Sequence, residues 1–406
     1  MERLLTADSI QPRILVAPDS LKETIDASSA ASAIAAGVRE VLPAAEVVIA
    51  PIADGGEGTL EVLAASIPDL EMIEALVPGP RPDRPPIRAR WGLGGDRRLA
   101  IVELAEASGL AQLEPADRDP LATGTAGVGH LLEMARSKLR RGGSKPSELL
   151  LAVGGSATVD GGLGAARALG MKVSGPHGAG DRSLVGADLE AVGAVQVDPG
   201  LLGDWAGVRL RLLGDVGNPL LGPDGAARVF GPQKGADERS IERLETGLRH
   251  WAAIMESLVG GRCDGPGTGA AGGVAVGLAP LLLVESEPAS DLAGSIESGF
   301  EVVAETIDLA RQLETADLVI TSEGSLDRQS MMGKAVGRLV TMAEKAAVPV
   351  MAVPGTADRL DGASADRFKV IRSLVEEVGV DASWQDPAGA LRTTVINALG
   401  VWNSRA

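Results

Sequence analysis

The residues Gly154–Thr158 (GGSAT) form the clearest of several glycine-flanked polar segments, and Asp160 follows closely behind them. Glycine allows the backbone to approach a ligand closely and to aim successive N–H groups at an anion. The segment has two interpretations, to which its composition gives equal weight. It is either a cradle for a phosphate group or a tight turn between a strand and a helix that requires positive φ.

Two acidic loops carry the second set of candidate groups. Asp54 and Glu57 stand three residues apart around two glycines, and Glu323 and Asp327 flank another glycine-containing loop. Such a pair suits Mg²⁺, which is commonly held through one or two carboxylates together with water and nucleotide phosphates. One carboxylate could instead act as the general base on a hydroxyl. The alternative for each loop is an acidic turn before a helix, but two such loops in one chain favour function.

Three lysines, Lys22, Lys234 and Lys334, stand next to polar or glycine-containing loop segments. The chain has a net charge of −17, so an anionic substrate needs a local group of cations. Lysines grouped with glycine loops are suitable anchors for a phosphate or a carboxylate. The alternative for each of them is a solvated position on the surface.

Several other chemistries are not supported. The run Gly267–Gly272 satisfies G-x-G-x-x-G, but no strand precedes it, as a dinucleotide-binding fingerprint requires, and helix packing explains it. No G-x-x-x-x-G-K-[ST] segment of a P-loop kinase occurs. The histidines His130, His177 and His250 have no metal-ligand spacing, and no local Ser–His–Asp signature accompanies them. The single cysteine, Cys263, excludes a disulfide framework and a cysteine zinc site and is interpreted as a small buried apolar residue.

The polar segments follow apolar runs that predict buried strands. Ile14–Ala17 and Val47–Ala50 are too short for helices, and an Ala-rich helix that Asp26 caps and that ends at Leu42 separates them. Strands that alternate with helices form a parallel sheet, and the loops after its strands emerge at one edge. The side chains placed at this edge are Ser20, Lys22, Asp54 and Glu57.

The alternation of strands and helices is regular near both ends of the chain and less regular in the glycine-rich middle. The Pro- and Arg-rich stretch Pro78–Arg90 is the best candidate for a crossing between domains. We predict one α/β domain from residues 1–78 and 286–406 and a second, glycine-rich α/β domain over residues 79–285. Further strands are predicted at Leu149–Val153, Arg209–Gly214, Leu318–Ile320 and Val350–Val353, and further helices near Thr59 and at Glu238–Leu258 and Lys334–Lys345.

Composition excludes several classes of protein. The net charge of −17 over 406 residues opposes sequence-independent binding to nucleic acid or to an anionic membrane. Five Trp, three Phe and no Tyr leave few platforms for stacking single-stranded bases. The first residues lack the apolar core of a signal peptide, which predicts a cytoplasmic protein. The uncharged stretch Gly265–Val284 contains six glycines and two prolines, so a packed internal helix is expected there and not a membrane span.

Seven segments occur in one order along roughly residues 12–370. They are Ala17–Lys22 (APDSLK), Ala53–Gly58 (ADGGEG), Gly154–Gly162 (GGSATVDGG), Asp215–Leu220 (DVGNPL), Phe230–Gly235 (FGPQKG), Gly269–Gly273 (GAAGG) and Glu323–Lys334 (EGSLDRQSMMGK). Together they resemble the type I glycerate kinases. Each segment alone is weak, but seven collinear segments are highly specific.

The resemblance implies ATP-dependent phosphorylation of D-glycerate with Mg²⁺, to 2- or 3-phosphoglycerate. It implies a flavodoxin-like parallel-sheet domain built from both chain ends, an inserted glycine-rich α/β domain, and an active site in the cleft between them. The expected partners are D-glycerate and ATP, with no nucleic acid and no membrane, and a homo-oligomer is left open. The implied catalytic residues are Lys22, Asp54, Glu57, Asp215 and Asp327, of which Asp54, Glu57 and Asp215 are candidate metal ligands. The candidates for substrate and phosphate binding are Ser20, Gly154, Gly155, Ser156, Thr158, Asn218, Gln233, Lys234, Glu323 and Lys334.

Two departures from the family pattern keep a competing hypothesis open. Val159 replaces a residue that is usually Asn, and Ser322 replaces a Gly, which matters if the loop needs positive φ there. The competing hypothesis is a non-catalytic protein that retains the pocket and binds small molecules or nucleotides. A nicotinamide dehydrogenase is disfavoured because no strand precedes Gly267. On the leading hypothesis, five side chains converge on one cleft: Lys22, Asp54, Glu57, Glu323 and Asp327.

Overall fold

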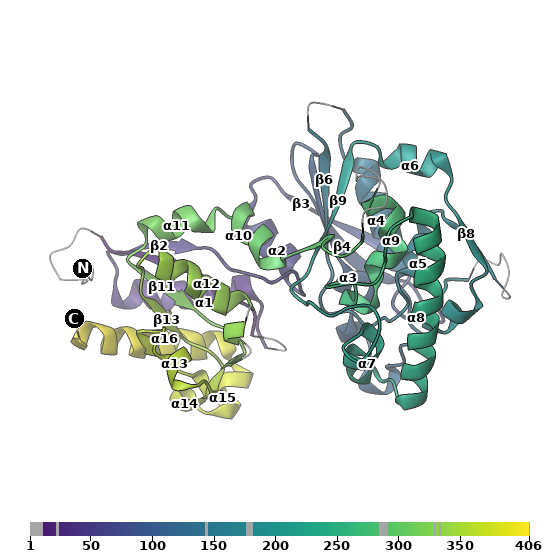
Figure 1. Ribbon diagram of the computed structural model, residues 1–406. Helices are drawn as coiled ribbons and strands as arrows, with labels where there is room; N and C mark the ends of the chain where they lie inside the picture. The colour runs from purple at the N-terminus through teal and green to yellow at the C-terminus, as the bar shows by residue number, and fades with distance from the viewer. Residues whose placement is uncertain are drawn as a thin grey trace. The chain divides into compact units, whose positions relative to one another are not determined.

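The computed structural model describes residues 11–21, 24–142, 145–175, 182–283, 291–328, 330–332 and 334–405. Contacts between residues divide the chain into two compact units. Unit 1 contains Met1–Asp54, Glu61–Ile67 and Phe300–Ala406, and unit 2 contains Gly55–Leu60 and Pro68–Gly299. Unit 1 therefore joins the two ends of the chain, purple and yellow in Figure 1, while unit 2 is built from the middle.

Unit 1 is built around a five-stranded parallel sheet in the order β2-β1-β11-β13-β15. Numbered by chain order within the unit, this order is 2-1-3-4-5, which is the flavodoxin-like arrangement. The prediction of a flavodoxin-like sheet from both chain ends is therefore confirmed. The strands are β1 (Arg13–Val16), β2 (Glu46–Ile49), β11 (Leu318–Thr321), β13 (Val350–Ala352) and β15 (Val370–Ile371), with a separate parallel pair of β12 (Ser325–Asp327) and β14 (Thr356–Arg359).

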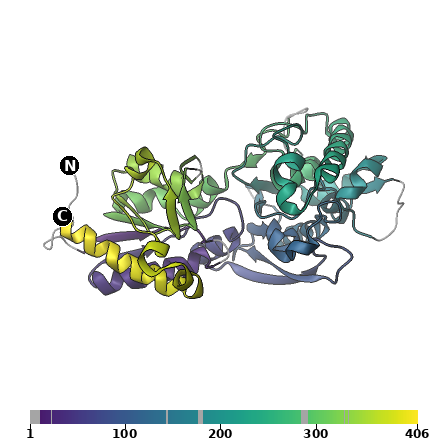
Figure 2. The ribbon, with the colours of Figure 1, turned by 90° about the horizontal axis from the view of Figure 1, so that it is seen from below.

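Helices lie on both faces of this sheet, as Figure 1 shows, which explains why its central strands are apolar on both faces. Helix α1 (Ala27–Val41) begins where the Asp26 carboxylate accepts a hydrogen bond from the Ser29 N–H at 2.8 Å, as predicted. It packs closely on α16 (Pro387–Arg405), seen side by side in Figure 2, because Gly37 has no side chain and a Cβ there would lie 2.9 Å from a backbone oxygen of α16. The other helices are α2 (Thr59–Ser66), α10 (Gly299–Thr306), α11 (Leu309–Thr315), α12 (Ala335–Lys345), α13 (Gly362–Ala365), α14 (Leu374–Val378) and α15 (Val380–Gln385).

Unit 2 contains a mixed six-stranded sheet in the order β10-β9-β6-β5-β4-β3. The pairs β3–β4 and β4–β5 are antiparallel, and the other pairs are parallel. The strands are β3 (Glu71–Val77), β4 (Ile87–Leu93), β5 (Leu99–Glu103), β6 (Ser147–Ala152), β9 (Val208–Leu213) and β10 (Ile296–Glu297), with a separate antiparallel pair of β7 (Lys172–Ser174) and β8 (Ala194–Gln196). The helices are α3 (Leu104–Ser108), α4 (Ala126–Lys138), α5 (Leu163–Ala168), α6 (Pro199–Trp205), α7 (Ala226–Phe230), α8 (Glu238–Val259) and α9 (Val274–Leu282).

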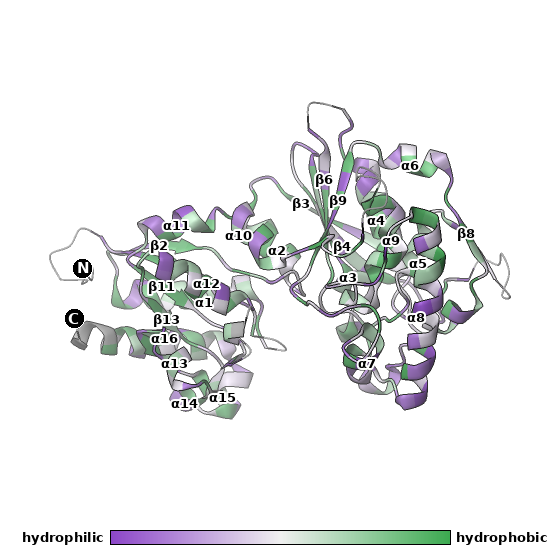
Figure 3. Cartoon of the chain, in the orientation of Figure 1, coloured by the Kyte–Doolittle hydropathy of each residue, from purple (hydrophilic) through white to green (hydrophobic). Residues whose placement is uncertain are grey.

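Helix α8 buries the apolar face that the spacing of its residues predicts. It is 22 residues long, and the carboxylate of Asp237 caps its first turn. One face buries Leu244, Leu248 and Trp251, while most of the hydrophilic residues, purple in Figure 3, lie outside this face. The Trp251 indole N–H donates to the Gly161 carbonyl at 2.8 Å. The predicted amphipathic helix is therefore confirmed, and it packs directly against the glycine-rich segment behind the GGSAT loop.

Two segments differ from their predicted roles. Pro78–Arg90 is not a crossing between the two units, because β3 and β4 on either side of its loop pair with each other within the sheet of unit 2. The chain passes between the units after Asp54, Leu60, Ile67 and Gly299, whereas the predicted boundaries are 78 and 285. In the uncharged stretch Gly265–Val284 only α9 is an α-helix, preceded by a glycine-rich turn, and Val284 lies outside the described residues.

None of the helices in the described parts of the chain is long and apolar enough to cross a membrane.

Candidate active site

The carboxyl ends of β1 and β11 meet at the centre of the unit 1 sheet. The Ala17 N–H donates to the Ile320 carbonyl at 2.9 Å, and the Asp19 N–H donates to the Ser322 carbonyl at 2.8 Å. In a sheet of this order, neighbouring loops diverge between these two strands and leave a crevice where ligands bind. The segments that contain Ser20 and Glu323 are therefore joined at the position where an α/β fold ordinarily binds its ligand.

Glu323 is the most perturbed side chain at this edge. It is 7% exposed, and burial raises the pKa of its carboxyl to about 7. A hydrogen bond with Ser330 and the charge of Lys334 lower this pKa, while the charges of Asp19 and Asp327 raise it further. Among the described residues, no group hydrogen-bonds to Glu323 Oε1. These groups influence one another, so the structure brings together Glu323 and Asp327, as predicted, and adds Lys334 to them.

Asp327 is the last residue of β12, and Lys334 ends the short segment that connects β12 to α12. The Ser330 N–H donates to Asp327 Oδ1 at 3.0 Å, and the Asp327 N–H donates to Ser330 Oγ at 3.1 Å. These reciprocal bonds fix the Asp327 carboxylate. Lys334 is exposed immediately before the first turn of α12. Lys22, Gln329 and Gly333 lie outside the described residues.

Asp54 lies at the same edge as Ser20, as predicted. It follows β2, and the Ile52 N–H donates to the Pro18 carbonyl at 2.9 Å, which ties the segment after β2 to the segment after β1. Asp54 is half-buried. Ser20 is half-buried as well, and its N–H donates to Asp19 Oδ1 at 2.7 Å.

Glu57 belongs to unit 2, unlike Asp54, which lies three residues earlier. The reason is buried Glu103 at the end of β5, whose Oε1 accepts the Gly58 N–H at 3.0 Å and whose Oε2 accepts the Leu60 N–H at 3.1 Å. The Gly154 N–H also donates to the Gly55 carbonyl at 3.0 Å. The convergence of Glu57 with the acidic groups of unit 1 stays a prediction.

The GGSAT loop follows β6 and is held by several backbone bonds. The Gly155 carbonyl accepts the Leu110 N–H at 2.8 Å, and the Ala157 N–H donates to the Ser108 carbonyl at 2.8 Å. Gly155 has φ +72, so its left-handed backbone favours glycine. A Cβ at Gly154 would lie 2.3 Å from the Gly56 Cα, so this position has no room for a side chain. Both glycines of the predicted turn are therefore required by the backbone.

The same loop retains groups that could bind an anion. Within the part of the chain that the structure describes, no acceptor hydrogen-bonds to the backbone N–H of Gly155 or of Ser156. Gly155 is exposed. A Cβ built on it would lie 3.6 Å from the Glu57 Cβ, so the Glu57 side chain stands beside the loop. The tight turn and the anion cradle are compatible, because the residues that form the turn leave two successive donors unused.

Lys234 lies inside unit 2, so its interpretation as a solvated surface lysine is wrong. It is 3% exposed, and its Nζ donates to Ser156 Oγ at 2.7 Å and to the Thr158 carbonyl at 2.8 Å. Burial lowers the pKa of Lys234 to about 7, and the charge of Asp160 opposes this shift. Gln233, the preceding residue, is exposed.

Asp160 lies two residues after the GGSAT loop and holds the following segment through its carboxylate. Its carboxylate accepts hydrogen bonds from the Thr125 N–H and hydroxyl, both at 2.8 Å, and from the N–H groups of Gly162 and Gly164. It is fully buried, and burial raises its pKa despite these four donors. Asp160 therefore orders the segment structurally, and its oxygens are occupied by the protein itself.

Asp215 and Asn218 follow β9, the neighbour of β6. The Val153 N–H donates to the Leu213 carbonyl at 3.0 Å, so the segments after both strands leave the same edge of the unit 2 sheet. Asp215 is half-buried, and the Asn218 amide donates to the Asp224 carbonyl at 2.9 Å. The structure thus groups Glu57, Asp215 and the GGSAT loop within unit 2.

The two departures from the family pattern have simple structural explanations. The Val159 side chain is fully buried in the apolar core of unit 2, so it does not face a ligand. Ser322 does not have positive φ, and its hydroxyl donates to the Val353 carbonyl at 2.7 Å. Serine is accommodated there without backbone strain, and neither substitution disturbs the candidate site.

The described residues contain no group of three or more His, Cys, Asp or Glu side chains arranged to hold a metal ion. This result does not conflict with a Mg²⁺ role, because Mg²⁺ in kinases is bound through one or two carboxylates together with substrate phosphates. Asp54 in unit 1, and Glu57 and Asp215 in unit 2, are carboxylates, the type of oxygen ligand that Mg²⁺ prefers.

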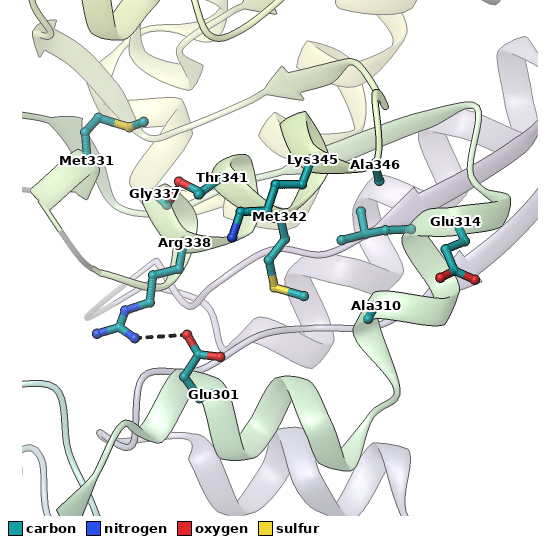
Figure 4. Close-up of a pocket in the computed structure, with 11 residues that line it drawn as sticks. Glu301, Ala310, Glu314, Met331, Gly337, Arg338, Thr341, Met342, Lys345 and Ala346 are labelled. Atoms are coloured by element: carbon teal, nitrogen blue, oxygen red, sulfur yellow. Dashed lines mark hydrogen bonds and ion pairs between the residues drawn. The ribbon is translucent and has the colours of Figure 1, made fainter.

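A cavity of about 560 Å³ lies elsewhere in unit 1, along α12 and beside α10 and α11 (Figure 4). Its lining includes Met331, Met342 and an ion pair in which Arg338 Nη1 lies 3.2 Å from Glu301 Oε1. None of the predicted site residues lines this cavity.

Sequence reasoning missed three residues that organise the site: Asp19, Glu103 and Ser330. Asp19 stands in a recognised segment, and its position directly after β1 could have identified it. Glu103 ends an apolar strand far from the loop that it holds, so no local pattern identifies it. Ser330 acts through the turn that it makes with Asp327.

Comparison with known proteins agrees with this geometry. Residues 14–403 match the glycerate kinase family. The chain is 37% identical to the glycerate 2-kinase of Escherichia coli over 345 residues, covering 85% of each chain. It is 36% identical to the glycerate kinase of Bacillus subtilis over 381 residues, covering 93% of this chain and 91% of the relative. A crystal structure of a candidate glycerate kinase 2 from Salmonella typhimurium is similar, with a TM-score of 0.78 and 32% identity over 98% of this chain and 99% of that one. With matching segments, a matching fold and relatives along nearly its whole length, this chain belongs to the glycerate kinase family.

Proposed function

We propose that this glycerate kinase transfers the γ-phosphoryl group of ATP to a hydroxyl of D-glycerate in a reaction that requires Mg²⁺. The observation that carries the proposal is the GGSAT loop, where Gly155 has a left-handed backbone and the N–H groups of Gly155 and Ser156 are two successive donors without an acceptor among the described residues. Backbone donors of this kind suit the oxygens of a phosphate group. The acidic groups of unit 1 supply the second requirement of a kinase, which is carboxylates near a ligand-binding sheet edge.

Phosphoryl transfer depends mainly on positioning and on neutralising charge. A bond forms between the glycerate oxygen and the γ-phosphorus, and the bond from that phosphorus to the β–γ bridging oxygen breaks, which leaves ADP. The GGSAT amides would hold phosphate oxygens, and Lys334 would offset negative charge. Mg²⁺, when bound, would neutralise phosphate charge, with Asp54, Glu57 and Asp215 as its candidate ligands. The proposal takes the groups of both units to act in one reaction.

The hydroxyl proton of glycerate must be accepted as the new bond forms. The catalytic candidates Asp54, Glu57, Asp215 and Asp327 are carboxylates that could accept it. Glu323 is a further acceptor, since a pKa of about 7 lies close to the working pH at which a general base is most effective. Lys22, which lies outside the described residues, is proposed to bind an anionic group of a ligand.

The 2-hydroxyl is proposed as the acceptor, because the relative from Escherichia coli is named a glycerate 2-kinase. The C2 and C3 hydroxyls of glycerate lie close together, so the position in which the substrate binds decides which of them receives the phosphoryl group. Phosphorus NMR of the product distinguishes 2-phosphoglycerate from 3-phosphoglycerate directly. A product that is mainly 3-phosphoglycerate would contradict this part of the proposal.

A coupled assay of ADP release with D-glycerate, ATP and Mg²⁺ tests the reaction. ADP release should depend on all three components and should stop when EDTA removes the metal. L-Glycerate and related hydroxy acids serve as controls for substrate choice. Folded protein that releases no ADP with any of these acids, yet is thermally stabilised by ATP or glycerate, would support the alternative of a non-catalytic binding protein.

A further inference from the structure

The side-chain amino group of Lys234 is buried against the GGSAT loop. Its Nζ lies 2.7 Å from Ser156 Oγ and 2.8 Å from the Thr158 carbonyl oxygen, and the residue is 3% exposed. Both contacts are to the loop that carries the unused N–H groups of Gly155 and Ser156. Lys234 therefore contacts the side chain of Ser156 and the backbone of Thr158, while Gly155, in the same loop, is exposed to a ligand.

The positive charge of Lys234 has neutral hydrogen-bond partners and no carboxylate in direct contact among the described residues. Among the described residues, no carboxylate forms an ion pair with Lys234. Asp160 is the acidic group that acts on it electrostatically, and its oxygens are bonded to Thr125, Gly162 and Gly164. Arg118, whose backbone lies against Gly235, is itself a cation, and the Glu57 carboxylate stands beside Gly155 of the GGSAT loop. A buried cation without an ion pair shifts toward its neutral form, and burial accordingly lowers the pKa of Lys234 to about 7.

We propose that Lys234 is the positioning residue of the GGSAT loop. When an anionic group binds to the N–H donors of Gly155 and Ser156, Lys234 takes up one proton. This inference rests on the proposed function, which assigns the loop to an anionic group. A bound phosphate or sulfate places negative charge close to the buried amine and favours its ammonium form. The proton comes from solvent. The ammonium then holds Ser156 and Thr158 in place while the anion is bound.

Calorimetric titration with sodium sulfate measures this coupling. Sulfate is a tetrahedral dianion that does not itself titrate between pH 6 and 9, so any proton exchanged belongs to the protein. Titration in two buffers with different heats of ionisation gives the number of protons taken up. At pH 8, a lysine of pKa about 7 is mostly neutral, and uptake should reach about 0.9 proton per sulfate bound. Sulfate affinity should then fall by up to about tenfold per pH unit above pH 7.

Two variants of Lys234 separate charge from structure. Lys234→Arg keeps a positive charge that does not titrate in this range, so it should bind sulfate without proton uptake and with an affinity independent of pH up to 9. Lys234→Met should weaken binding at pH 6 by about tenfold or more and abolish the uptake. Lys145→Met, at an exposed lysine of the same unit, is the matched control and should behave like the wild type.

The inference is overturned if Lys234→Arg retains the wild-type proton uptake, or if the wild-type protein binds sulfate without any uptake. Absence of sulfate binding to the wild-type protein would also overturn it. Glycerate-dependent release of ADP is measured separately, so the proposed kinase reaction can succeed while this inference fails. If the wild-type protein releases no ADP with glycerate, that result counts against the proposed function, whatever the result with sulfate.

Discussion

Replacement of Glu323 by Gln is expected to stabilise this protein at alkaline pH while changing its stability little near pH 4.5. Burial raises the pKa of the Glu323 carboxyl from 4.5 to about 7, and nearby Asp19 and Asp327 act in the same direction. The folded state therefore keeps a proton that the unfolded chain releases above pH 4.5. The free energy of unfolding contributed by this group falls as the pH rises from 4.5 through 7, and the loss is complete above that range.

The magnitude follows from the size of the pKa shift. A shift of roughly 2.5 pKa units corresponds to about 3 kcal/mol at 1.36 kcal/mol per unit. The E323Q variant has no titrating group at this position, so its contribution is constant with pH. The difference in unfolding free energy, variant minus wild type, should rise by up to about 3 kcal/mol between pH 4.5 and pH 9. Any constant difference in packing between the two side chains cancels in this comparison.

Urea unfolding followed by far-ultraviolet circular dichroism at several pH values between 4.5 and 9 measures this difference. Glu344→Gln is the matched control, because Glu344 also lies in unit 1 and its ion pair with Arg367 lowers its pKa. That group contributes stability above its unfolded pKa, so the control should be destabilised at neutral pH, by about 1 kcal/mol or less for an exposed pair. A difference for E323Q that does not change with pH would refute the assignment of a raised pKa to Glu323.

Three further predictions concern other positions. Asp54→Asn should lower kcat by about 10² to 10⁴ in the coupled ADP assay with an unchanged circular dichroism spectrum, and near-normal turnover would remove Asp54 from the site. Asp160→Ala leaves the donors of Thr125, Gly162 and Gly164 without their acceptor, so urea unfolding should show a loss of about 1–3 kcal/mol; a loss below about 0.5 kcal/mol would contradict its structural role. Asp26→Ala removes the cap of α1 and should cost about 1 kcal/mol in the same experiment, and no measurable change would mean that the cap is dispensable.

Local pattern was sufficient for several elements of the fold. Short apolar runs predicted β1, β2, β6, β9, β11 and β13 within one or two residues, and Asp26 and the Ala-rich run predicted α1. Since strands that alternate with helices pair in parallel, the pattern also placed Ser20 and Asp54 at one sheet edge. Hydrophobic periodicity and capping act over a few residues, and for that reason they can be read without a structure.

Only the tertiary structure decided which segments belong together and which polar groups are buried. Glu57 lies in unit 2 because Glu103, 45 residues away from Gly58, accepts the N–H groups of its loop. Lys234 is buried because the GGSAT loop, about 78 residues earlier in the chain, supplies the acceptors for its ammonium. The pKa of Glu323 likewise depends on Asp19, from the opposite end of the chain. Burial and hydrogen-bond partners are set by contacts between distant segments, and the residue types near a lysine or a glutamate do not encode those contacts.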